Sequence, residues 1–295
     1  MTNKQFEDSL IHWGSTKNKG KYFVKMHGLD NHFVIVDGRD DQYEPDADEI
    51  IKICHSRHGV GADQLIVIQN PTKKGVMSDA CALMRIFNID GNEAEACGNA
   101  TRCVAWLLMD ELSSNFIKLE TLAGILECHK TGRMKVSSSM GKVEKDWRRI
   151  PLNSPIKKYS EELNLGPLND PIILSVGNPH IIYFVENLEK IDIELWAPKI
   201  QSSSIFPNQV NVGIAKIVDG NNLQLRVFER GVGLTSACGS GACAAVYASI
   251  EKGLAKTNKM RVHMTAGYLD IKISQENIAI MEGPVAFSFA GKLIM

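Results

Sequence analysis

Short apolar runs recur along the chain, separated by turns rich in Gly, Asn, Asp and Pro. Many of these runs alternate apolar with polar residues or contain β-branched and aromatic residues, which is typical of β-strands. They read YFVKM, FVIVDG, QLIVIQ, ALMRIFN, FIKLET, GILECHK, IIYFVE and QLRVFER. Because the runs are short and closely spaced, they predict a protein dominated by antiparallel sheet.

Two longer segments have a different pattern, with small and apolar residues at helical spacing. They are GNATRCVAWLLMDEL, directly after Cys97, and GSGACAAVYASIEKG, directly after Cys238. This spacing predicts two helices. Each cysteine is therefore expected at a helix N-terminus, and the fold class is expected to be α+β.

An internal repeat relates these two segments. RIFNIDGNEAEACGN from Arg85 and RVFERGVGLTSACGS from Arg226 both read Arg, aliphatic, Phe, nine further residues and Cys-Gly. The offset is 141 residues for the arginines (226 − 85) and for the cysteines (238 − 97), close to half of the chain. The repeat predicts two similar domains, 1–141 and 142–283, each a curled, mainly antiparallel, barrel-like sheet around a central helix.

The composition is that of an ordinary globular protein, with 44% hydrophobic and 23% charged residues in a chain of 295. The formal net charge is −1, so we expect no nucleic-acid partner and no membrane partner. The sequence shows neither a signal peptide nor an apolar run that could span a bilayer, so a cytoplasmic location is expected. In that compartment the seven cysteines are expected to be free thiols.

Cys97 and Cys238 differ from the other cysteines because they occupy the same position in two copies of one unit. A helix N-terminus carries partial positive charge and unpaired N–H groups, which stabilise a thiolate. If one thiol removes a proton from one face of a carbon and the other delivers a proton to the opposite face, the centre is inverted. The N–H groups that open the two helices are expected to form a cradle for carboxylate charge, and they belong to Gly98, Asn99, Gly239 and Ser240.

Other patterns have simpler interpretations. GSGACA from Gly239 matches a dinucleotide-binding fingerprint, but the acidic residue expected about twenty positions later is missing. Cys54, His55 and His58 form a short cluster of potential metal ligands, but no second ligand pair at zinc spacing accompanies it. The remaining cysteines are expected to be small core residues, and they are Cys54, Cys81, Cys103, Cys128 and Cys243.

Several segments together resemble the diaminopimelate epimerase family. They are KMHGLDNHFVIVDG, RHGVGADQLIVI, RIFNIDGNEAEACGNATRC, GNPHIIYF, NQVNVG and FERGVGLTSACGSGACAAV. They extend from Lys25 to Val246 in the family's order, and the two cysteine segments make the resemblance specific. Residues 1–20 are an extension beyond it, and their role is open.

The resemblance implies two domains related by a pseudo-two-fold axis, with residues 284–295 returning to the first domain. It implies a reaction without pyridoxal phosphate or metal in which Cys97 and Cys238 are the acid and base. The implied reaction interconverts LL- and meso-diaminopimelate, in lysine and peptidoglycan precursor biosynthesis. Matching positions imply substrate contacts at Asn31, Gln64, Asn88, Asn178, His180, Asn211, Glu229 and Arg230, together with the four cradle residues.

Two of these contacts suit a substrate with an amino-acid group at each end. Arg230 can bind a distal carboxylate through two N–H groups, and Glu229 can accept from a distal ammonium. A site that binds both groups strongly rejects analogues that lack them.

The sequence departs from the family pattern at Asp30, His32 and Leu234, where the family usually has Gly, Asp and Glu. Asp30 and His32 flank Asn31, and Leu234 removes a carboxylate from the segment that approaches Cys238. An epimerase or racemase of another amino acid on the same fold therefore stays an alternative. A non-catalytic amino-acid-binding protein is a second one, and whether the chain forms a homodimer is open.

Overall fold

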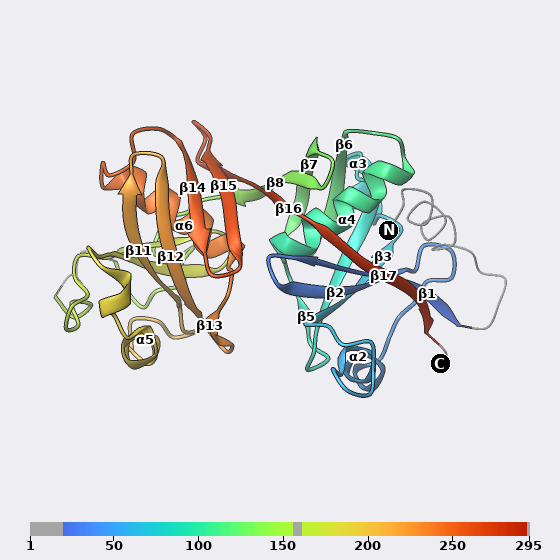
Figure 1. Cartoon of the computed structure of the whole chain (residues 1–295), viewed down its shortest axis with the longest axis horizontal. Helices are drawn as coiled ribbons and strands as arrows, with labels where there is room; N and C mark the ends of the chain where they lie inside the picture. The colour runs from blue at the N-terminus through green and yellow to red at the C-terminus, as the bar shows by residue number, and fades with distance from the viewer. Residues whose placement is uncertain (1–19, 156–160, 294–295) are drawn as a thin grey trace. The chain divides into compact units, whose positions relative to one another are not determined.

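The structure of the chain is a computed structural model that describes residues 20–155 and 161–293 (Figure 1). Residues 1–19 of the expected extension and residues 294 and 295 of the expected return segment lie outside the described residues. The chain divides into unit 1, residues 1–138 and 284–295, and unit 2, residues 139–283. The first division falls between Ser138 and Ser139, whereas the sequence analysis placed it after Gly141.

The strands of unit 1 form one continuous series of paired strands. They are β1 (Lys21–Gly28), β2 (Asn31–Asp37), β3 (Gln64–Gln69), β4 (Ala82–Asn88), β5 (Glu93–Ala94), β6 (Phe116–Thr121), β7 (Gly124–Gly132), β8 (Lys135–Lys142) and the C-terminal β17 (Ala286–Leu293). In order of pairing the series runs β17, β1, β2, β3, β4, β6, β7, β8, and β5 pairs with β4. The pairs β2–β3 and β4–β6 are parallel, and the others are antiparallel.

Unit 2 repeats this topology. Its strands are β9 (Ile172–Ser175), β10 (Pro179–Phe184), β11 (Asn211–Asp219), β12 (Asn222–Glu229), β13 (Gly233–Thr235), β14 (Lys259–Met264), β15 (Gly267–Ile273) and β16 (Ile278–Pro284). The series runs β9, β10, β11, β12, β14, β15, β16, and β13 pairs with β12. The pairs β10–β11 and β12–β14 are parallel, and they correspond to β2–β3 and β4–β6 of unit 1. The strand series β1 to β8 and β9 to β16 therefore correspond one to one, which confirms the predicted duplication.

Helices fill the connections that the parallel pairs require, because parallel strands need a crossover. In the first crossover of each unit lie α2 (Ala47–Cys54) and α5 (Ile193–Gln201), the latter preceded by the 3₁₀ turn η2 (Leu188–Lys190). In the second lie α4 (Gly98–Glu111) and α6 (Gly239–Glu251), which are the two helices predicted from the sequence. A short helix, α3 (Lys73–Met77), lies between β3 and β4.

α4 and α6 are the central helices of their units (Figure 1). Every residue from Asn99 to Met109 in α4 is buried, and so is every residue from Gly241 to Ser249 in α6. α4 packs in one apolar cluster with side chains from the strands around it. A helix buried on all sides is stable only inside a surrounding layer, so the predicted curled sheet around a central helix is confirmed for each unit. The pseudo-two-fold axis stays a prediction.

The turn between β1 and β2 explains how the sequence accommodates Asp30. Leu29 and Asp30 both have positive φ, 52° and 60°, as in a type I′ hairpin turn. Asp tolerates this left-handed conformation better than most residues other than Gly and Asn, because its short polar side chain can hydrogen-bond locally. The turn places Asn31 as the first residue of β2, with its Cα opposite Gly28 of β1.

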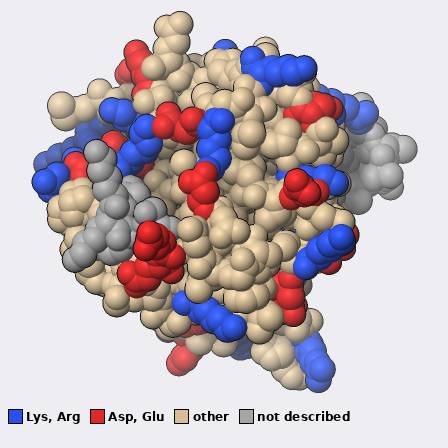
Figure 2. Space-filling model, turned by 90° about the vertical axis from the view of Figure 1, so that its left-hand side faces the viewer, with Lys and Arg blue, Asp and Glu red and all other residues tan. Residues whose placement is uncertain are grey.

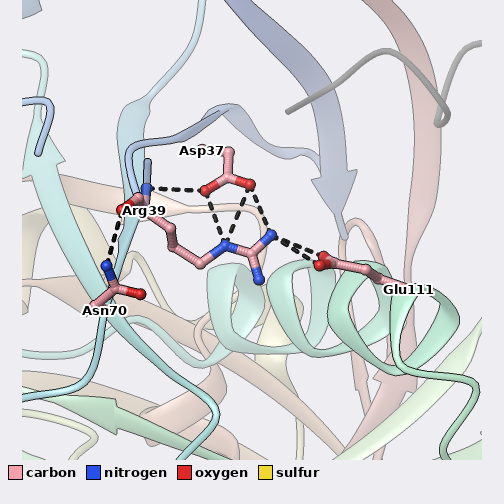
Figure 3. A network of polar contacts seen from close by, with 4 residues as sticks. All are labelled: Asp37, Arg39, Asn70 and Glu111. Atoms are coloured by element: carbon pink, nitrogen blue, oxygen red, sulfur yellow. Dashed lines mark hydrogen bonds and ion pairs between the residues drawn. The ribbon is translucent and has the colours of Figure 1, made fainter. Parts of the chain in front are cut away.

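An arginine ties the C-terminal end of α4 to the end of β2 (Figure 3). Arg39 donates from Nε and Nη2 to both carboxylate oxygens of Asp37, and from Nη2 to Glu111 at 2.9 and 3.0 Å. Asn70 Nδ2 donates to the Arg39 carbonyl at 2.8 Å. Because Glu111 stands at the negative end of the helix dipole, this guanidinium offsets an otherwise unfavourable carboxylate.

Lysines, arginines and carboxylates are interspersed on the face drawn in Figure 2, with no broad area of a single sign. This distribution agrees with the net charge of −1. Within residues 20–155 and 161–293, no helix is both long and apolar enough to cross a membrane.

Candidate active site

The expected site residues form two groups, one in each unit. The Cys97 group lies in unit 1 and consists of Asn31, Gln64, Asn88, Cys97, Gly98 and Asn99. The Cys238 group lies in unit 2 and consists of Asn178, His180, Asn211, Glu229, Arg230, Cys238, Gly239 and Ser240. In each group, a helix N-terminus supplies the cysteine and the two residues after it, and neighbouring strand ends or the residues next to them supply the other side chains.

Cys97 is the N-cap residue of α4, as the sequence predicted. Its backbone is extended (φ −148°, ψ 107°), its carbonyl accepts from Thr101 N at 2.9 Å, and its side chain is half-buried. The thiol donates to Asn31 Oδ1 at 3.6 Å, and Asn99 Nδ2 donates to the same oxygen at 3.4 Å. The Asn31 carboxamide therefore holds the sulfur from the side of β2, next to the first N–H groups of the helix.

Gln64 and Asn88 form a second amide pair in unit 1. Gln64 opens β3, Asn88 closes β4, and the two lie opposite each other in the antiparallel ladder. Gln64 Nε2 donates to Asn88 Oδ1 at 2.9 Å, while the buried Gln64 Oε1 has no hydrogen-bond partner among the described residues. An unsatisfied buried acceptor is costly, so this oxygen is suited to receive a donor from a bound substrate.

Cys238 is the N-cap residue of α6, with the same extended backbone (φ −135°, ψ 111°). Its sulfur is more enclosed than that of Cys97, because the residue is only 4% exposed. Sγ accepts from Gly241 N at 3.4 Å and lies 3.6 Å from Ser240 Oγ. Both cysteines thus open a central helix, but a carboxamide contacts one sulfur and a hydroxyl the other.

Burial has the largest effect on the Cys238 thiol. Desolvation raises its pKa well above the ordinary value, the nearby Glu229 carboxylate raises it further, and the hydrogen bonds from Ser240 and Gly241 only partly oppose this. The helix N–H of Gly241 lowers the pKa of Cys238, as the sequence argument expects of a helix N-terminus, but burial and Glu229 outweigh this effect. At neutral pH this residue is a thiol, which makes it a proton donor.

His180 lies against the Cys238 group from β10 and is fully buried. Its Nε2 is 2.9 Å from Asn178 Oδ1 and 3.0 Å from Ser240 Oγ. Desolvation, and then the positive charge of Arg230, lower its pKa from 6.5 to about 3. The ring is therefore neutral at physiological pH, and it links Asn178 to Ser240, the serine that contacts the Cys238 sulfur.

Asn211 is the counterpart of Gln64, because it opens β11 as Gln64 opens β3. Its Nδ2 donates to Pro179 O at 3.0 Å, and its Oδ1 accepts from Arg230 N at 3.0 Å. The exposed Arg230 side chain donates from Nη1 to Asn208 O at 3.1 Å. Asn211 thus orients the strand end from which the Arg230 guanidinium extends.

Glu229 closes β12 as Asn88 closes β4, and its Oε1 accepts from Thr235 Oγ1 at 2.7 Å. Leu234 lies on β13 opposite Phe228 and is 40% exposed. The carboxylate that affects Cys238 is therefore supplied by Glu229, although Leu234 stands where the family usually has Glu.

Two residues that the sequence analysis did not single out contribute to the Cys97 group. Asp63 Oδ2 accepts from Asn31 Nδ2 at 3.2 Å and from His32 N at 2.7 Å. Arg102 is fully buried in α4 and donates from Nη2 to Asn99 Oδ1 at 2.7 Å. A lone arginine in a helix of small and apolar residues was the available signal for Arg102, and Asp63 directly precedes Gln64 in the sequence.

The other five cysteines occupy core positions. Cys54, Cys103, Cys128 and Cys243 are buried, and Cys81 is half-buried. Burial raises the pKa of Cys54 to about 11 and those of Cys103 and Cys128 to about 12. No group of three or more His, Cys, Asp or Glu side chains is arranged to hold a metal ion within the part of the chain that the structure describes.

Each group by itself places a thiol beside the first N–H groups of a helix, an arrangement that suits proton transfer and favours an anion. A sequence model of the family "Diaminopimelate epimerase" matches residues 23–145 and 172–288. The diaminopimelate epimerase of Acidiphilium cryptum (strain JF-5) is 41% identical over 271 residues, which cover 92% of this chain and 95% of that protein. The chain belongs to the diaminopimelate epimerase family. The expected enzyme class, an isomerase acting as an epimerase, is confirmed.

Solved structures support the fold of this family member. The Bacillus anthracis phenazine biosynthesis protein of the PhzF family has a TM-score of 0.66 at 16% identity, over 94% of this chain and 100% of that one. A hydroxyproline epimerase from Agrobacterium vitis, solved with bound trans-4-hydroxy-L-proline, has a TM-score of 0.65 at 13% identity, over 94% and 93% of the two chains. At these identities the likeness shows the fold alone, and it confirms the two-domain α+β class.

Proposed function

We propose that this chain interconverts LL- and meso-diaminopimelate by a two-base mechanism. The observation that supports it most directly is the pair Cys97 and Cys238, each the N-cap of the central helix in its unit. In one direction the Cys97 thiolate takes the α-proton and becomes a thiol, while the Cys238 thiol gives its proton to the opposite face and becomes a thiolate. Protons balance, and the reverse reaction exchanges the two roles.

The anionic intermediate is stabilised by the helix N-termini. Removing the α-proton places charge on the substrate carboxylate, and the N–H groups of Gly98, Asn99, Gly239 and Ser240 serve as its donors. The chain's own residues thereby supply the acid, the base and the anion stabilisation, and we propose that neither pyridoxal phosphate nor a metal takes part.

The side-chain amides of the two groups, together with the charged residues Arg230 and Glu229, select the substrate. Five amide side chains lie at strand ends or next to them in the two groups, so they orient the amino-acid moiety undergoing inversion. They belong to Asn31, Gln64, Asn88, Asn178 and Asn211. Arg230 binds the distal carboxylate and Glu229 the distal ammonium. We further propose a cytoplasmic enzyme that binds this small molecule and neither nucleic acid nor membrane, with a homodimer left open.

Deuterium incorporation tests the reaction. LL-diaminopimelate incubated with the enzyme in deuterated water should give meso product with solvent deuterium at the inverted α-carbon, because the incoming proton comes from an exchanged thiol. A panel of single amino acids in the same assay separates this function from that of a racemase with another substrate. A protein that binds diaminopimelate without washing deuterium into it would be a binder, and the proposal would be wrong.

The two-thiol assignment is tested by Cys97→Ala and Cys238→Ala. Each variant should lose epimerisation by at least about a thousandfold, because water in a closed site replaces a positioned acid or base poorly. Cys103→Ala and Cys243→Ala change buried cysteines on the same two helices and should keep near-normal turnover. Near-native turnover in either N-cap variant would exclude that thiol as an acid–base group.

A further inference from the structure

Arg102 is a fully buried charged residue whose presence in α4 the fold does not explain. Its counterpart in α6, at the offset of 141, is Cys243, which is also fully buried. The same position in the duplicated fold is thus filled by a small side chain in one unit and by a guanidinium in the other. Because burying a charge costs free energy unless it is well hydrogen-bonded, a specific role for Arg102 is indicated.

The contacts of Arg102 lead to the Cys97 sulfur. Nη2 donates to Asn99 Oδ1 at 2.7 Å, and Nη1 donates to Gly98 O at 3.3 Å. Asn99 Nδ2 donates to Asn31 Oδ1 at 3.4 Å, and that oxygen is 3.6 Å from Cys97 Sγ. A continuous path of hydrogen bonds therefore joins the guanidinium to the thiol.

The charged groups at the two ends of this path fix the direction of each hydrogen bond. A guanidinium only donates, so Asn99 must accept with its oxygen and point its NH₂ group at Asn31. At the other end, Asp63 only accepts, so Asn31 gives its NH₂ group to Asp63 and its oxygen to Asn99 and Cys97. If either amide were rotated by 180°, a donor would face a donor and an acceptor would face an acceptor.

Unit 2 lacks this arrangement and places other groups at the corresponding positions. Ser240 takes the place of Asn99 at the offset of 141, and its hydroxyl contacts Cys238 directly. The Ser240 hydroxyl in turn lies 3.0 Å from Nε2 of the neutral His180. The path from a buried cation to the sulfur is therefore a feature of the Cys97 group.

We propose that Arg102 is a positioning residue for Cys97: through Asn99 it fixes the orientation of the Asn31 amide beside the sulfur and weakens the hold of the Asn31 oxygen on the thiol proton, so that the sulfur is more available as a base. The cation draws electron density along the amides, which weakens Asn31 Oδ1 as an acceptor for the thiol proton. It therefore favours the thiolate of Cys97. The acid–base role of Cys97 is taken from the proposed function, on which this inference rests.

The test uses Arg102→Met, which keeps length and removes every donor. Alkylation by iodoacetamide is followed at several pH values, and mass spectrometry of peptides reports Cys97 and Cys238 separately in one protein. The midpoint of the Cys97 profile should move up by about one pH unit, so its labelling at neutral pH falls about tenfold. The Cys238 profile should stay in place, and kcat should fall by a similar factor.

A merely structural role would give a different result. Loosened packing would change the rate of alkylation on the high-pH plateau and would affect both cysteines. The proposed role instead moves the pH midpoint of alkylation, and only for Cys97. The titratable groups of unit 1 near this part of α4 include His27, His32, Asp63 and Cys103, and the substitution leaves all four residues in place. Arg102→Lys keeps a donor-only cation and should restore Cys97 labelling to within about threefold.

Arg39→Met is the matched control, since Arg39 contacts the opposite end of the same helix through Glu111 (Figure 3). It should lower the melting temperature and leave both labelling midpoints unchanged. If Arg102→Met does not fold, Asn99→Leu breaks the same path at its next residue and should give the same selective shift. An unmoved Cys97 midpoint in a folded variant, or equal shifts at both cysteines, would overturn the proposal.

The labelling result does not depend on the substrate. If diaminopimelate is epimerised but the Cys97 midpoint does not move, the role of Arg102 is wrong and the proposed function stands. If the midpoint moves in a protein that does not epimerise diaminopimelate, the positioning role stands and the proposed function fails.

Discussion

At the scale of single residues, the two cysteines have equivalent positions and different surroundings. Cys97 is half-buried and contacts a carboxamide, while Cys238 is buried and contacts a hydroxyl and a backbone N–H. Burial raises the pKa of Cys238, so the unliganded protein holds a proton there. The two-base mechanism proposed above needs one thiol and one thiolate at a time, and the burial of Cys238 favours the proton on that residue.

Replacing Arg230 by Lys should lower kcat/KM for diaminopimelate about a hundredfold. The substitution keeps the positive charge but removes the planar pair of N–H groups that matches a carboxylate. Steady-state kinetics provide the measurement, and Arg226→Lys, on the strand β12 that directly precedes Arg230, serves as a control with little expected effect. Unchanged kinetics in Arg230→Lys would mean that this residue does not bind the distal carboxylate.

His180 should make the protein less stable as the pH falls. Its folded-state pKa, about 3, lies below the ordinary 6.5, so between these values the unfolded chain binds a proton that the folded protein excludes. Above pH 6.5 the neutral His180 makes its full contribution to the free energy of unfolding. This contribution decreases as the pH falls toward 3, by at most about 5 kcal/mol. Urea unfolding at a series of pH values measures it.

In His180→Gln this part of the pH dependence should disappear. The exposed His263, on β14 of the same unit, is the control, and His263→Gln should leave the slope unchanged. If the slope is equally steep in wild-type and His180→Gln proteins, the buried imidazole does not remain neutral in the fold.

At the scale of elements, the N-termini of α4 and α6 are two versions of one structure. Residue Ala100 of α4 corresponds to Gly241 of α6 at the offset of 141. Only in α6 does the N-cap sulfur accept from the third helical N–H, and Cys97 makes no such side-chain cap. A Cβ at Gly241 would lie 2.9 Å from Val227 Cγ2 and 3.2 Å from Cys238 Sγ, so this glycine leaves space for the sulfur.

Gly241→Ala should therefore reduce kcat about 10- to 100-fold, because it displaces the Cys238 sulfur by a fraction of an ångström. The loss is expected even though alanine favours a helix by about 1 kcal/mol over glycine. Ala100→Gly is the reciprocal control and should cost roughly that stability while turnover is kept. A fully active Gly241→Ala enzyme would show that the sulfur position tolerates this displacement.

At the scale of the whole molecule, the chain passes from unit 1 to unit 2 within β8 and returns within β16. It ends in β17, which pairs with β1 over nearly its full length, so the last strand belongs to the unit that contains the first strand. Gly291 lies opposite Phe23 in this pair, and a Cβ there would approach the Phe23 ring to 2.8 Å. The returning strand therefore packs closely against the Phe23 ring at this glycine.

Gly291→Val should weaken this docking by about 1 to 3 kcal/mol, the usual range for overpacking. Hydrogen exchange should rise in peptides from β1 and β17 and stay unchanged in unit 2. Lys292→Val adds the same side chain at the next position, on the other face of the strand, and is expected to have little effect. Equal exchange in both variants would show that the Phe23 contact does not limit docking.

The sequence by itself determined most of the strands named above, both central helices, the duplication and both N-cap cysteines. These features depend on local periodicity and on a repeat that has kept its spacing, so they are readable along the chain. The family resemblance then named amides and charged residues at strand ends. The comparisons confirm the family, and the roles of these residues stay predictions.

Only the tertiary structure decided how these groups are protonated and oriented. Burial of Cys238 beside Glu229 reverses the expected pKa shift, because desolvation depends on neighbours from several elements and has no signature in local sequence. Likewise, Arg102, Asp63 and Asn31 are far apart in the chain and form one path only because β2, α4 and the residue before β3 meet. Spacing along a sequence shows which residues can share an element, whereas hydrogen-bond direction and dielectric environment arise from contacts between elements.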